Sequence, residues 1–139
     1  RLGYALCGDG ELLERLAAAG PPWAVSAPAQ AAGLAALTLC PDWPERARAL
    51  LAAERPALTV GLEALGLEVL PSQANYLLFR AAGVCDLKER ALERGVLIRA
   101  CGSYPGLGPD WYRVCVGGRE QNGRLLAALK EALSWQRRS

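Results

Sequence analysis

Residues 95–117 read GVLIRACGSYPGLGPDWYRVCVG, and this stretch decides the fold class. It contains two short apolar runs, Val96 to Ala100 and Tyr112 to Val116, each interrupted by one arginine. A loop rich in glycine and proline, Gly102 to Asp110, separates them. Apolar runs bounded by glycine and proline are typical of strands. We therefore predict two strands joined by this loop.

The residues before this stretch predict two more strands and a short helix. The strands are expected from Leu67 to Leu70 and from Asn75 to Arg80. The helix is expected from Asp86 to Arg94, because Asp86 and Glu89 have the spacing of a capping box. Gly95 fits the C-terminal cap of that helix.

A closing helix and the order of the elements complete the predicted fold. The helix is indicated by a stripe of leucines at helical spacing, namely Leu125, Leu126, Leu129 and Leu133. The order strand-strand-helix-strand-strand-helix lacks strict strand-helix alternation, so we expect a mostly antiparallel sheet with helices covering one face. The predicted fold class is α/β, with this α+β unit as a small domain at residues 67–139.

The first 66 residues read as helices preceded by one strand, Leu2 to Leu6. Asp9 is expected to cap a helix to about Ala18, and Ser26 a second helix to Leu39. The second helix carries no charge, so it should be packed on nearly every side or face a partner. A long helix follows, which Pro56 should bend or split and Gly66 should end. The predicted domains are 1–40, 41–66 as a connecting helix, and 67–139.

Composition narrows the possible functions. The 139 residues have a net charge of +2, which argues against binding of nucleic acid or a membrane surface, and no apolar run reaches a membrane-spanning length. Five cysteines without Cys-x-x-Cys spacing, and the lack of any histidine, argue against a metal site and favour reduced thiols in a cytoplasmic protein. Because the chain contains no methionine, we expect a processed form or a piece of a longer protein.

Two arginines inside apolar strands are the most informative residues. Side chains alternate along a strand, so Arg99 is expected to share a face with Leu97 and Cys101, and Arg113 with Cys115. A guanidinium is costly to bury without an anion, and two on one sheet could hold one carboxylate. An internal salt bridge or an exposed edge strand would explain them equally well from spacing alone.

Other polar residues carry weaker signals. Asn75 and Tyr76 at a strand start fit either a local turn hydrogen bond or a contact in a site. Tyr104 could simply fill its turn-rich loop. Gly117-Gly118-Arg119 lacks the further glycines of a dinucleotide-binding loop, so we predict no phosphate cradle there.

Four motifs together resemble the C-terminal part of fold-type I pyridoxal-phosphate enzymes, in the class I/II aminotransferase superfamily. The motifs are Arg1-Leu2-Gly3-Tyr4, Ser72-Gln73-Ala74-Asn75-Tyr76-Leu77-Leu78, Gly95-Val96-Leu97-Ile98-Arg99 and Tyr112-Arg113-Val114. Within that family the chain resembles histidinol-phosphate aminotransferases and L-threonine-O-3-phosphate decarboxylases. The loop Tyr104-Pro105-Gly106-Leu107 favours the decarboxylases.

The resemblance implies roles for particular residues. Arg1 would bind the phosphate of pyridoxal phosphate, Arg99 and Arg113 would bind the substrate carboxylate, and Asn75 and Tyr104 would line or neighbour the site. The substrate would be a small phosphorylated amino acid, and the enzyme a homodimer. Residues 1–40 would be the trailing part of the large cofactor-binding domain.

Three functions follow as alternatives. The first is decarboxylation of threonine phosphate to aminopropanol phosphate, used in cobalamin biosynthesis. The second is transamination of histidinol phosphate or a similar amino acid, and the third is a non-catalytic α+β binding module. The family's Schiff-base lysine precedes the motif that begins at Arg1, and Lys88 and Lys130 read as solvated helix residues. These 139 residues alone are therefore expected to be inactive, with no catalytic residue assigned.

Overall fold

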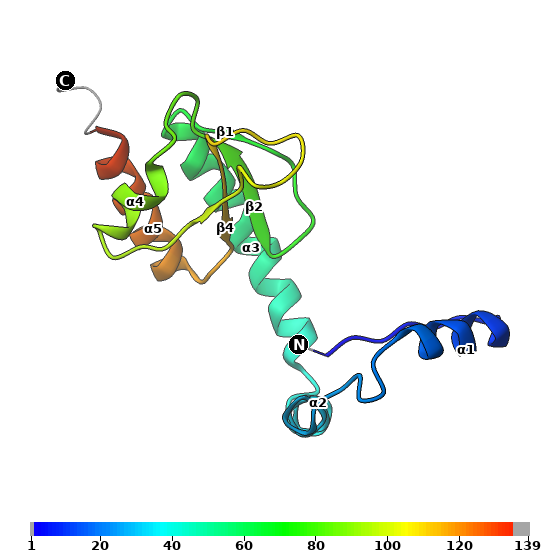
Figure 1. The fold of residues 1–139 in the computed structure, drawn as a ribbon. Coiled ribbons are helices and arrows are strands. Elements are labelled where there is room, and N and C mark those ends of the chain that lie inside the picture. The colour runs from blue at the N-terminus through cyan, green and yellow to red at the C-terminus, as the bar shows by residue number, and fades with distance from the viewer. Residues whose placement is uncertain (1, 135–139) are drawn as a thin grey trace. The chain divides into compact units, whose positions relative to one another are not determined.

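The computed structural model of the chain describes residues 2–134 (Figure 1). The chain divides into two compact units, residues 1–45 and residues 46–139. No helix in the described part of the chain is both long and apolar enough to span a membrane. The predicted domain boundaries at residues 40 and 66 remain a prediction.

The first unit contains α1 (Gly10–Ala19) and α2 (Ala27–Leu39), close to the predicted ranges. The carboxylate of Asp9 accepts a hydrogen bond from the Leu12 amide at 3.1 Å and so caps α1 as expected. Ser26 makes no side-chain cap to α2. Neither helix has a buried residue within the described chain, so the expected packing around α2 is not provided here.

The predicted strand from Leu2 to Leu6 is wrong. Residues 2–8 are exposed and form no regular secondary structure. A strand depends on hydrogen bonds from a neighbouring strand, and the described residues offer none to this segment. The apolar segment that suggested a strand therefore has no pairing partner among the described residues.

The long helix α3 (Trp43–Ala64) runs through Pro56 without a break, so the predicted split does not occur. Proline removes one backbone hydrogen bond, but Leu58 and Leu62 anchor the turns that follow in the core. The helix ends just before Gly66, as predicted. Gly66 has a φ of 81°, and the Leu67 amide bonds to the carbonyl of Leu62 at 3.3 Å.

Four strands form one sheet in the order β1-β2-β4-β3, and every neighbouring pair is antiparallel, as predicted. The long inner strands are β2 (Tyr76–Arg80) and β4 (Trp111–Cys115). The outer strands, β1 (Glu68–Val69) and β3 (Arg99–Ala100), are shorter than expected. The pairing of β3 with β4 extends through one further bond, from the Cys101 amide to the Trp111 carbonyl at 2.8 Å.

One face of this sheet is covered by helices. On it lie Leu77 and Phe79 of β2 and Tyr112 and Val114 of β4, all buried. They form the core with apolar residues of α3, α4 (Leu87–Leu92) and α5 (Arg119–Ser134), and Figure 1 shows these helices around the sheet. The residues that alternate with these along β2 and β4, including Tyr76 and Arg113, occupy the opposite face. The alternation thus separates the core from a face available for binding.

The start of α4 is capped by a residue that the sequence pattern did not indicate. Asp86 makes no side-chain cap and instead pairs with Arg90 at 2.8 Å. The buried hydroxyl of Tyr112 accepts a hydrogen bond from the Leu87 amide at 3.2 Å and donates one to the Val84 carbonyl at 2.8 Å. Burial raises the pKa of Tyr112. The predicted capping box is therefore wrong, whereas the predicted cap at Gly95, with a φ of 74°, is confirmed.

Candidate functional site

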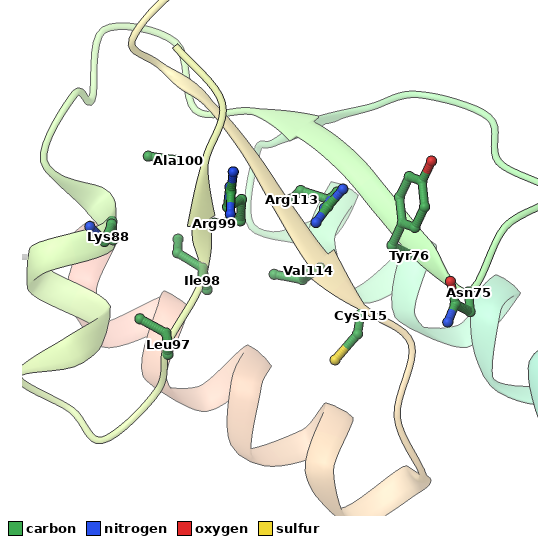
Figure 2. A pocket seen from close by; sticks show the side chains of 10 residues that line it. All are labelled: Asn75, Tyr76, Lys88, Leu97, Ile98, Arg99, Ala100, Arg113, Val114 and Cys115. Atoms are coloured by element: carbon green, nitrogen blue, oxygen red, sulfur yellow. The ribbon is translucent and has the colours of Figure 1, made fainter. Parts of the chain in front are cut away.

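A cleft of about 840 Å³ lies on the open face of the sheet (Figure 2). Its walls come from the start of β2, from β3 and the residues before it, from β4, and from α4. The lining residues are Asn75, Tyr76, Lys88, Leu97, Ile98, Arg99, Ala100, Arg113, Val114 and Cys115. The cleft lies entirely within residues 46–139, so this unit alone forms its walls.

The structure brings the two predicted arginines together. Arg99 and Arg113 are direct partners across the antiparallel pair β3 and β4, so their side chains leave the sheet on the same face. The guanidinium carbon of Arg113 lies 4.8 Å from the centre of the Tyr76 ring, a cation–π contact that holds the arginine on one side (Figure 2). Arg99 is exposed and Arg113 is half-buried.

The cleft contains no negative charge to neutralise these arginines. Among the described residues that line it, three are cationic and none is acidic. No ion pair to Arg99 or Arg113 is found within residues 2–134, so an internal salt bridge does not explain them there. Arg99 does lie on an edge strand, as the alternative explanation required, but Arg113 lies on an inner strand. Two like charges on facing residues repel each other unless an anion lies between them.

The two cysteines that were expected to share a face with the arginines differ in exposure. Cys101 is buried, whereas Arg99, two residues earlier, is exposed. Because β3 ends at Ala100, the shared face of Arg99 and Cys101 stays a prediction. On β4 the alternation holds, and Cys115 lies on the same face as Arg113 and lines the cleft.

The segment that carries Asn75 and Tyr76 is held by a set of hydrogen bonds. The hydroxyl of Ser72 donates to the Tyr76 carbonyl at 2.7 Å and accepts from the Ala74 amide at 3.0 Å. Arg55 of α3 donates to the Ala74 carbonyl at 3.0 Å. The Asn75 carbonyl accepts from the Val116 amide at 2.8 Å. The backbone is therefore fixed where Asn75 and Tyr76 line the cleft, and the role of Asn75 in a site stays a prediction.

Lys88 is the cleft residue that the sequence pattern missed. It was expected on a solvated helix face, but it is half-buried and lines the cleft from α4. The rotation of α4 is fixed by Leu87 and Ala91, which are fully buried. The only sequence signal available was the spacing of these two apolar residues around the lysine.

The remaining predicted residues lie elsewhere. Tyr104 is in the loop between β3 and β4, is 41% exposed, and is not among the residues that line this cleft. Arg1 lies outside the described residues. The amides of Gly117 and Gly118 are occupied by the side chains of Asn122 and Gln121, at 2.9 and 3.1 Å. These bonds occupy both glycine amides, and the prediction that no phosphate cradle forms there is not tested further.

The family model described as Aminotransferase class I and II matches residues 1–129. The chain belongs to this family. The family uses pyridoxal phosphate, and the predicted resemblance is thereby confirmed.

Two relatives represent the two activities considered from the sequence. The chain is 45% identical to a histidinol-phosphate aminotransferase of Symbiobacterium thermophilum, over 96% of this chain and 36% of that protein. It is 39% identical to a threonine-phosphate decarboxylase of Salmonella typhimurium, over 96% of this chain and 37% of that protein. The chain thus spans little more than a third of the length of these relatives.

Solved structures show the same fold. A histidinol-phosphate aminotransferase from Clostridium acetobutylicum matches with a TM-score of 0.76 and 23% identity, over 89% of this chain and 38% of that one. An L-threonine-O-3-phosphate decarboxylase from Porphyromonas gingivalis matches with a TM-score of 0.68 and 27% identity, over 91% and 40%. Further relatives named histidinol-phosphate aminotransferase, from Nitratidesulfovibrio vulgaris and Anaeromyxobacter, favour the aminotransferase alternative over the decarboxylase that the loop at Tyr104 suggested.

The described residues fit an anionic substrate group rather than the cofactor itself. The cleft offers cationic donors, but no lining residue is a carboxylate that could pair with a pyridine nitrogen. Arg1, which the resemblance assigns to the cofactor phosphate, lies outside the described part of the chain. No catalytic step through pyridoxal phosphate is therefore derived from these residues.

Proposed function

We propose that the protein is a pyridoxal-phosphate-dependent aminotransferase acting on histidinol phosphate or a similar phosphorylated amine, and that this chain supplies the part of the site that binds the substrate's anionic group. The proposal depends on one observation. Arg99 and Arg113 lie on the open face of a sheet without an acidic partner in the cleft, in a chain 45% identical to a histidinol-phosphate aminotransferase.

The chemistry of the arginine pair supports this role. A guanidinium presents several N–H donors in a fixed plane and binds a carboxylate or phosphate through two parallel hydrogen bonds. Histidinol phosphate has a phosphate ester and no carboxylate, so the ester is the group that Arg99 and Arg113 would hold. Tyr76 would keep Arg113 in place through the contact at 4.8 Å, and Asn75 would offer an amide beside it.

Holding this group orients the substrate amine and α-carbon relative to the rest of the site. When bound, pyridoxal phosphate supplies the electron sink that both transamination and decarboxylation require. The arginines would contribute binding and orientation only. By fixing one end of the substrate, they would influence which of its bonds lies in the reactive position.

Decarboxylation of threonine phosphate is the second candidate. The 39% identity to the Salmonella typhimurium decarboxylase over 96% of this chain supports it. Threonine phosphate carries a carboxylate as well as a phosphate, so the arginine pair could hold either group. The cobalamin pathway role and the formation of aminopropanol phosphate belong to this candidate.

Parallel assays of the protein at its full natural length distinguish the two candidates. One reaction contains histidinol phosphate with an oxo acid as amino acceptor, and the other contains threonine phosphate. We expect transfer of the amino group to the oxo acid in the first and no release of carbon dioxide in the second. Carbon dioxide release without amino transfer would favour the decarboxylase over the aminotransferase. If neither reaction occurs, the binding-module alternative remains.

Two further properties belong to the proposal. A homodimer is proposed from the resemblance to the family, and sedimentation of the full-length protein tests it. A cytoplasmic location is proposed because all five cysteines are free.

A further inference from the structure

We propose that Lys88 is a third anion-binding residue of the cleft and that it makes the site selective for a phosphate monoester over a carboxylate. This inference depends on the proposed function, in which Arg99 and Arg113 bind the substrate's anionic group. It adds a residue from α4, an element that neither arginine belongs to. The sequence motifs that resemble the family do not include this lysine.

Lys88 shares a cleft with the arginine pair. Lys88 lines the same cleft as Arg99 and Arg113, and Figure 2 shows the three side chains in a row from α4 across β3 to β4. The hydroxyl of Tyr112 caps α4 at Leu87, and Tyr112 directly precedes Arg113 on β4. The helix that carries the lysine is therefore tied to the strand that carries the arginine.

Lys88 is available to bind an anion in the cleft. The side chain is half-buried, and no ion pair to it is found within residues 2–134. The nearby carboxylate of Asp86 pairs with Arg90 at 2.8 Å and not with Lys88. A partly desolvated ammonium gains from an anion in the cleft, because its hydration is already incomplete.

Charge decides which anion fits. Among the described residues that line the cleft, three side chains are cationic and none is acidic. A carboxylate carries one negative charge and offers two oxygens, which the arginine pair can satisfy. A phosphate monoester carries a charge of about −1.5 to −2 near pH 7 and offers three terminal oxygens. The third oxygen and the second charge are what Lys88 would bind, so its effect should fall mainly on phosphate.

The test uses the protein at its full natural length with its cofactor bound, so that the cofactor's own phosphate subsite is filled. Calorimetric titrations give the affinity for two probes, inorganic phosphate and acetate, near pH 7.5. The variants are Lys88→Met, which keeps the apolar stem, Lys88→Arg, which keeps the charge, and Arg113→Met. Lys130→Met is the matched control, since Lys130 is exposed on α5 and outside this cleft.

We expect Lys88→Met to weaken phosphate binding about tenfold, the loss typical of one charge-assisted hydrogen bond, and to change acetate binding less than about twofold. Lys88→Arg should keep most of the phosphate affinity, and Lys130→Met should behave as wild type. Arg113→Met should weaken the binding of both phosphate and acetate.

Two results would overturn the inference in distinguishable ways. If Lys88→Met binds phosphate as tightly as Lys130→Met while Arg113→Met still loses phosphate affinity, Lys88 has no binding role and the proposed function stands. If Arg113→Met also binds phosphate normally, the arginine site and the proposed function fall together. Unfolding midpoints of all variants, measured in urea, show whether an affinity loss reflects a loss of folding.

Discussion

Replacing Tyr112 by phenylalanine tests how the core and the cleft are connected. The substitution removes one hydroxyl and keeps the aromatic ring, which packs 5.9 Å from the ring of Phe79. The hydroxyl is buried, donates to the Val84 carbonyl at 2.8 Å and accepts from the Leu87 amide at 3.2 Å. Phenylalanine therefore leaves both backbone groups without this partner, in a place that water does not reach.

The expected size follows from these two bonds. A buried polar group that loses its partner costs about 1–3 kcal/mol, so two such groups predict a loss of roughly 2–6 kcal/mol in the free energy of unfolding. With a urea dependence of about 1–2 kcal/mol per molar, the unfolding midpoint should fall by at least about 1 M. Tyr104→Phe is the matched control, because Tyr104 is 41% exposed, and it should change stability by less than about 0.5 kcal/mol.

The pH dependence gives a second readout of the same residue. Because burial raises the pKa of Tyr112 in the folded state, its contribution is complete below the unfolded pKa of about 10 and is lost as pH rises through the folded value. The stability gap between wild type and Tyr112→Phe should therefore narrow above pH 10. Equal midpoints for Tyr112→Phe and Tyr104→Phe at neutral pH would refute the proposed role of the hydroxyl.

Three other predictions concern an ion pair, a thiol and the arginine pair. Arg80 lies 2.8 Å from Asp110 and lowers the pKa of that carboxyl. Asp110 therefore contributes stability at neutral pH that is lost as pH falls through its lowered pKa. In acid titrations followed by circular dichroism, Asp110→Asn should lose less stability than wild type below about pH 4. Cys101 is buried whereas the other four cysteines are exposed, so mass spectrometry after brief alkylation should find Cys101 unmodified until the protein is unfolded, and rapid native labelling of Cys101 would contradict its placement. Arg113→Ala in the full-length protein should lower affinity for anionic substrates at least about tenfold, while Arg124→Ala, an exposed residue of α5, should not; equal kinetics for both variants would remove Arg113 from the site.

The features that sequence could predict depend on neighbours along the chain. Gly66 and Gly95 end helices because a positive φ is easy only for glycine, and their position after an apolar stripe is visible in the sequence. The alternation in β2 and β4 likewise follows from strand geometry. It correctly placed Arg113 and Cys115 on one face.

The features that sequence missed depend on residues far apart in the chain. The cap of α4 comes from Tyr112, 25 residues after Leu87, and it acts where a local carboxylate was expected. The place of Lys88 in the cleft depends on how α4 docks against β4, which no local pattern encodes. The strand expected at residues 2–6 failed for the same reason, because a strand forms only where a neighbour can pair with it.

The central claim is that the open face of this sheet binds the anionic group of a phosphorylated substrate. The most direct measurement is a crystal structure of the full-length protein with histidinol phosphate bound. We expect the phosphate to lie between Arg99 and Arg113, with oxygen atoms about 3 Å from both guanidinium groups. A bound substrate whose phosphate lies away from both arginines would contradict it.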